Sequence, residues 1–109
     1  MGCQPNLLTL FVEPSRVTRR AGEVIEVSVS VVRRTSMDGV MIYASMPQHP
    51  KKLNFKPINL VPTQTQATLR LRLDERVQLP PRVAVEIFAK SSRDGLPVSA
   101  VTTLTLLAP

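Results

Sequence analysis

The residues of this sequence that are able to hold a metal ion or act as a nucleophile are few. It has one histidine, His49, between Gln48 and Pro50 in an expected loop, and one cysteine, Cys3, close to its start. A zinc site draws on Cys and His ligands at short regular spacings, and a hydrolase triad needs a histidine beside a nucleophile in a recognisable motif. Neither pattern is present. We therefore expect His49 to be a solvated loop residue, Cys3 to be incidental, and the chain to hold no metal and no cofactor.

Acidic residues give an equally weak signal for catalysis. Asp74 and Glu75 form the one adjacent acidic pair, and they follow an alternating stretch where a loop is expected. A glycosidase needs two carboxylates placed across a bound sugar. The stretch RLDER, residues 72–76, partly resembles a calcium-ligating stretch of cadherin repeats but lacks their other acidic motifs. With no glycine-rich phosphate loop and no dinucleotide-binding fingerprint, the sequence indicates a protein that is not an enzyme.

Basic charge is the most prominent chemical feature of the sequence. Lys and Arg number 14 against 8 Asp and Glu, which gives a formal net charge of +6 at pH 7. Such a charge favours association with nucleic acid, anionic glycans or other acidic surfaces. Binding of single-stranded nucleic acid also uses stacking aromatic rings, and this chain has one Tyr, three Phe and no Trp. We therefore expect no nucleic-acid partner, and an anionic glycan stays a candidate ligand for Arg33, Arg34, Arg70 and Arg72.

Apolar and polar residues alternate along most of the chain, and no apolar pattern of helical period lasts for three turns. Seven strands are expected, at residues 7–12, 24–34, 39–46, 53–60, 65–73, 83–90 and 98–107. Pro57 restricts the fourth strand to a sheet edge or to an irregular extended segment. Turns are expected at residues 37–39 and 91–95, where Asp and Gly tolerate a positive φ. This pattern indicates an all-β fold, an immunoglobulin-like antiparallel sandwich of two sheets and about seven strands, with a small closed barrel as the structural alternative.

The alternation also predicts which side of each strand faces the core. The residues expected to point inward are Ile25, Val27, Val29, Val31, Val40, Ile42, Leu69, Leu71, Leu73, Val83, Val85 and Ile87. On the outer side, Glu26 is expected opposite Arg70 or Arg72 on a neighbouring strand, as an exposed ion pair.

The same alternation places a group of apolar residues on the outer face of one sheet. Met41, Tyr43, Phe88 and Val101 fall on this face if the strands at 39–46, 83–90 and 98–107 lie in one sheet. An apolar cluster on the exterior of a sandwich indicates contact with a neighbouring domain or another protein. Two alternatives stay open: a loop or the N-terminal segment covers the cluster, or the register differs by one residue and the faces are exchanged.

Five stretches in order resemble the immunoglobulin-like β-sandwich repeats of large bacterial secreted and surface proteins. They are LFVEPSRVTRRAGEVIEVSVSVVR, DGVMIYASMP, LNFKPINLVPTQTQATLRLRL, PPRVAVEIFAKSS and VSAVTTLTLLAP, and the resemblance covers residues 7–107. The resemblance implies a module of a longer exported protein that acts as a spacer, a stalk or a binding surface. It transfers no functional residue, because the shared pattern is structural.

Residues 7–107 are accordingly expected to form one domain, and residues 1–6 a disordered or added tail without a signal peptide. The apolar runs are too short for a membrane span. The first functional hypothesis is a non-enzymatic structural or protein-interaction module, with the parent protein extracellular, at the cell surface or periplasmic. The second is an adhesive module that binds anionic glycan or another acidic surface through its arginines. An accessory domain of a hydrolase differs from the first hypothesis only in its neighbouring domains.

Overall fold

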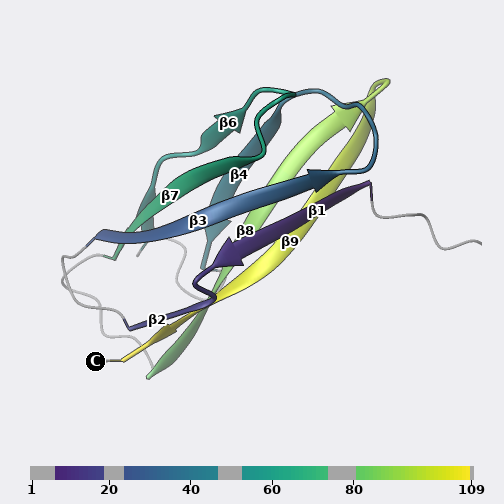
Figure 1. Cartoon of the computed structure of the whole chain (residues 1–109). Helices are drawn as coiled ribbons and strands as arrows, with labels where there is room; N and C mark the ends of the chain where they lie inside the picture. The colour runs from purple at the N-terminus through teal and green to yellow at the C-terminus, as the bar shows by residue number, and fades with distance from the viewer. Residues whose placement is uncertain (1–6, 19–23, 47–52, 74–80, 109) are drawn as a thin grey trace, which may run out of the picture.

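The structure, a computed structural model, describes residues 7–18, 24–46, 53–73 and 81–108. These residues form nine strands and no helix (Figure 1). The strands are β1 (Leu8–Glu13), β2 (Arg16–Thr18), β3 (Val24–Arg33), β4 (Val40–Ser45), β5 (Leu53–Phe55), β6 (Ile58–Leu60), β7 (Gln66–Leu73), β8 (Arg82–Arg93) and β9 (Leu96–Leu107). The predicted immunoglobulin-like two-sheet sandwich is confirmed.

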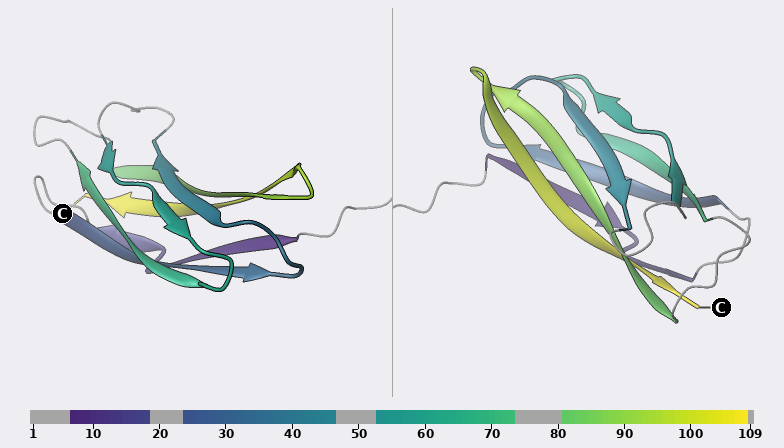
Figure 2. Two further views of the ribbon diagram at one scale, coloured as in Figure 1. Left: turned by 90° about the horizontal axis from the view of Figure 1, so that it is seen from above. Right: turned by 180° about the vertical axis from the view of Figure 1, so that it is seen from behind.

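The strands are divided between two sheets that lie face to face (Figure 2). The first sheet has the order β1-β3-β7-β5 and is antiparallel throughout. The second sheet has the order β2-β9-β8-β4-β6, and its β2–β9 pair is parallel. As predicted, the strands that carry Glu26 and Arg70 are neighbours, and so are the strands that carry Tyr43, Phe88 and Val101.

The core consists of the inward-facing residues of both sheets. Strand β3 shows the period of two most clearly, because Ile25, Val27, Val29 and Val31 are buried while the residues between them are exposed or half-buried. Every residue that the sequence analysis assigned to the core is buried. Complete burial of a Val, Leu or Ile side chain contributes roughly 1.5–3 kcal/mol, so these facing rows hold the two sheets together.

Two short segments explain why the strand count differs from the predicted seven. Strand β2 follows the cis Glu13–Pro14 peptide bond, where the chain leaves the first sheet and joins the second. The predicted strand at 53–60 is divided at Pro57 into β5, at the edge of the first sheet, and β6, at the edge of the second. Each piece has three residues, which is too short to show a period of two. Both predicted alternatives apply in part, because β5 and β6 are edge strands while Pro57 lies in the short link between them, outside either strand.

The two predicted turns differ in their physical basis. Strands β8 and β9 are joined by Asp94 and Gly95, which have φ values of 52° and 78°, as a two-residue hairpin turn requires. Gly39 does not have a positive φ, so the reason given for glycine at that turn was wrong. A Cβ at Gly39 would lie 2.9 Å from the carbonyl oxygen of Leu60. Glycine is needed there because the backbone of a neighbouring strand approaches closely.

Strand β9 has an open edge over much of its length in the described part of the chain. Strand β8 pairs with all of β9, whereas β2 pairs only with Thr105 and the two residues after it. The amide of Thr105 donates to the carbonyl oxygen of Ser15 (2.8 Å), away from β8. Because the direction of backbone groups alternates along a strand, the amides of Ser99 and Val101 also point away from β8. Pro97 occupies another such position, where no amide is needed.

Candidate functional site

The four predicted contact residues lie together on the outer face of the second sheet. The strand register places Tyr43 on β4 opposite Phe88 on β8, and Phe88 opposite Val101 on β9. Met41 precedes Tyr43 by two residues and therefore lies on the same face, opposite Lys90. We call Met41, Tyr43, Phe88 and Val101 the outer cluster. The alternative with exchanged faces is excluded, because the residues between them on β4 and β8 are buried.

The outer cluster is built around a pair of aromatic rings. The rings of Tyr43 and Phe88 are stacked, with their centroids 5.0 Å apart and their planes 13° from parallel. The ammonium group of Lys90 lies over the Tyr43 ring, 5.4 Å from its centroid, which is within the range of a cation–π contact. Met41 and Val101 flank the rings with 40% and 58% of their surface exposed. The cluster is thus an apolar surface with a rigid centre and one positive charge.

Lys90 was not among the predicted residues, although its place in the sequence indicates it. Lys90 follows Phe88 by two residues, so the alternation that placed Phe88 outside places Lys90 beside it. The group offers aromatic area and a flexible methionine, which are enriched at protein-contact surfaces, and Lys90 adds one positive charge. An apolar surface of this kind suits contact with another molecule.

The four arginines proposed for an anionic ligand do not lie together. Arg70 and Arg72 are on the outer face of β7, and the Nε of Arg70 is 3.1 Å from Oε1 of Glu26, the predicted ion pair. Arg34 directly follows the last residue of β3, whereas Arg72 pairs with Val24, the first residue of β3. Ten residues of extended chain place Arg34 and Arg72 about 33 Å apart.

Arg33 has a different environment from the other three arginines. Its guanidinium donates to the carbonyl oxygens of Gln64 (2.6 Å) and Val61 (3.1 Å), at the two ends of a turn that the Gln64 amide closes on the Val61 carbonyl (2.9 Å). Because side chains alternate between the two faces of β3, Arg33 is on the same inward side as Val31. Arg33 therefore holds a loop, and it does not share an anion-binding face with Arg34.

The remaining candidates cannot be placed, because Cys3, His49, Asp74 and Glu75 lie outside the described residues. Within the described ranges, no group of three or more His, Cys, Asp and Glu side chains is arranged to hold a metal ion. The same part of the chain contains no helix that is long and apolar enough to cross a membrane.

Comparisons with known proteins identify the fold. No protein-family model matches the chain, and no curated protein sequence matches it. Among solved structures, the chain resembles the crystal structure of the apo form of the Calx CBD1 domain, with a TM-score of 0.58. The two are 14% identical, and the alignment covers 94% of this chain and 98% of that domain. This chain is an immunoglobulin-like β-sandwich. At this identity the likeness carries the fold alone.

Proposed function

We propose that this chain is a non-enzymatic protein-interaction module whose outer cluster docks on a folded protein surface. The observation that carries the proposal is the stacked Tyr43–Phe88 pair on the outside of the second sheet, flanked by the exposed Met41 and Val101. The two rings are half-buried, and the apolar area that they and the flanking side chains still expose is stabilised when another surface removes it from water. Large aromatic residues are also over-represented among those that contribute most to binding.

The partner is a neighbouring domain of a longer exported bacterial protein, or a second protein that this domain meets outside the cytoplasm. The resemblance to immunoglobulin-like repeats supports this context, since such modules lie beside other domains. The side chain of Val101 belongs to the cluster, while its backbone lies on the open edge of β9. The proposed surface therefore reaches the border of the sheet, where a partner meets both apolar side chains and backbone groups that no described strand pairs.

Site-specific photo-crosslinking in the cells that make the protein tests the proposal. A photoreactive phenylalanine derivative replaces Tyr43 in one variant and Phe11 in a control variant; Phe11 is 54% exposed on the outer face of the first sheet. We expect a discrete cross-linked product from position 43 only, and its loss when Phe88→Ser is added. Equal products from positions 43 and 11, or a product at position 43 that Phe88→Ser leaves unchanged, would refute the proposal.

A further inference from the structure

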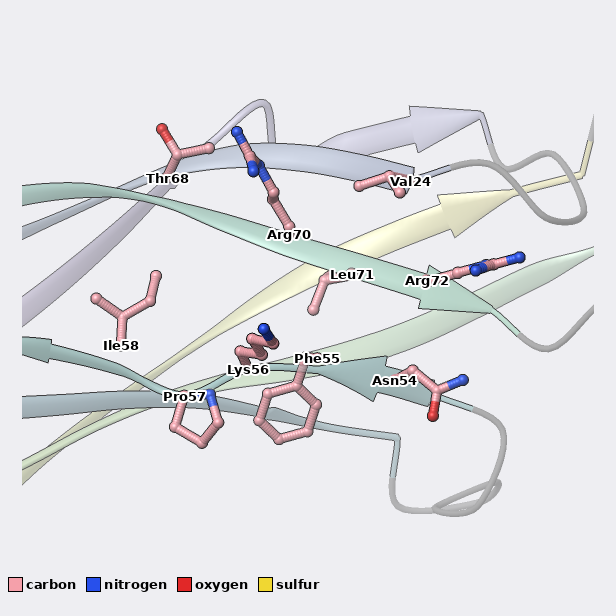
Figure 3. Close-up of a pocket in the computed structure, with 10 residues that line it drawn as sticks. All are labelled: Val24, Asn54, Phe55, Lys56, Pro57, Ile58, Thr68, Arg70, Leu71 and Arg72. Atoms are coloured by element: carbon pink, nitrogen blue, oxygen red, sulfur yellow. The ribbon is translucent and has the colours of Figure 1, made fainter.

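The first sheet carries a second surface feature, a groove lined by basic residues. A cavity of about 600 Å³ lies where β7 meets the segment that follows β5 (Figure 3). Its polar lining includes Lys56, Arg70, Arg72, Asn54 and Thr68. The volume is within the range of about 300–1,000 Å³ that is typical of small-ligand sites. The groove lies at the edge where the first sheet meets β6 of the second sheet, and it shares no residue with the outer cluster.

The strand register concentrates positive charge at the groove. The last β5–β7 pair is Phe55 with Leu71, and Lys56 follows Phe55 directly while Arg70 directly precedes Leu71, so both cations line the groove where this ladder ends. Like charges that share a groove repel each other, and a bound anion relieves this repulsion. Arg72 lies two residues from Arg70 on the same face, about 6.6 Å along the strand. Among the described lining residues none is acidic.

Apolar and neutral polar groups complete the lining. Figure 3 shows Thr68 and Arg70 projecting from β7, with Phe55 and Pro57 on the segment beside it. The exposed Pro57 offers flat apolar surface, whereas the half-buried Phe55 pairs with the buried Leu71 and packs against the core. The Asn54 amide and the Thr68 hydroxyl both donate and accept hydrogen bonds, as the hydroxyl groups of a sugar require.

We propose that this groove binds an acidic oligosaccharide through Lys56, Arg70 and Arg72. Separate cations along and across the strands match a ligand that carries several carboxylate or sulfate groups better than a single small anion. Neutral groups that exchange hydrogen bonds with hydroxyls favour a sugar chain over an acidic peptide. The Glu26 carboxylate competes with the ligand for Arg70, because it already forms an ion pair with the guanidinium group that the ligand would bind.

The test is heteronuclear NMR of the full chain, titrated with a heparin-derived oligosaccharide at about 0.01 M and about 0.15 M salt. We expect shifts centred on Asn54, Lys56, Thr68 and Arg70 that weaken at the higher salt. Lys56→Gln and Arg70→Gln should each weaken binding about threefold or more, whereas the matched control Arg34→Gln, about 33 Å from Arg72, should not.

Glu26→Gln gives the sharpest readout, because the loss of the competing carboxylate should strengthen binding about twofold to fivefold. The proposal is overturned if the shifts spread evenly over all basic residues, if Arg34→Gln weakens binding as much as Lys56→Gln, or if Glu26→Gln leaves the affinity unchanged. Equal affinity at the groove for an oligoglutamate peptide of matched charge would overturn the assignment to a sugar. None of these results bears on the outer cluster.

Discussion

Replacement of Arg33 by Met should destabilise the fold, although Arg33 is one of several surface cations in the sequence. The substitution keeps an unbranched stem and removes the two hydrogen bonds to the carbonyl oxygens of Val61 and Gln64. A hydrogen bond from a charged donor contributes roughly 1.5–3 kcal/mol when it is buried. The Val61 and Gln64 residues are exposed, so water replaces part of this contribution.

The Nε of Arg33 is buried and has no hydrogen-bond partner among the described residues, and its removal offsets a further part of the loss. The net cost should be about 1–2 kcal/mol, which corresponds to a decrease in Tm of about 4–16 °C for a domain of this size. Thermal unfolding followed by circular dichroism measures this decrease. Arg34→Met is the matched control, since Arg34 is exposed and adjacent, and its Tm should change by less than about 4 °C. Equal Tm values for the two variants would refute the conclusion that the hydrogen bonds of Arg33 stabilise the turn.

Three further predictions follow from the two sheets. The double variant Tyr43→Ser, Phe88→Ser should lose less than about 3 kcal/mol and remain a folded monomer by NMR, because both residues are outside the core; collapse of the spectrum would place them in the core. Gly39→Ala should cost about 1–3 kcal/mol in urea unfolding, since the new Cβ would meet a backbone carbonyl at 2.9 Å, and an unchanged midpoint would contradict this contact. In the same assay, Ser99→Pro should lower the free energy of unfolding by less than about 1 kcal/mol and Ala100→Pro by about 2 kcal/mol or more. The reason is that, of these two amides, that of Ala100 points toward β8. The reverse order would show that the register of β9 is wrong.

The long strands were predictable because each one shows its buried face repeatedly. Val27 and Val29 alternate with serines over enough positions to define the inward side, and the position of Phe88 outside follows from the buried Val85 and Ile87. The arrangement of Tyr43 against Phe88 needed the additional information that β4 and β8 are paired, which the order of a sandwich supplied.

The missed features depend on contacts between distant segments. Strand β2 is held by its parallel pairing with β9, which no local pattern of three residues reveals. The close approach of Leu60 to Gly39, and the contact of Arg33 with the turn at Val61, link residues far apart in the sequence. The grouping of Arg33 with Arg34 was avoidable, since adjacent residues of a strand point to opposite faces.

Hydroxyl-radical footprinting by mass spectrometry is the decisive test of the proposed contact, because it compares the purified chain with the same chain in the cells that make it. We expect Met41, Tyr43 and Phe88 to be oxidised in the purified chain and protected in the cells, while Phe11 is oxidised equally in both. Equal oxidation of Tyr43 and Phe88 in the two samples would mean that no partner covers the outer cluster, and would contradict the proposed function.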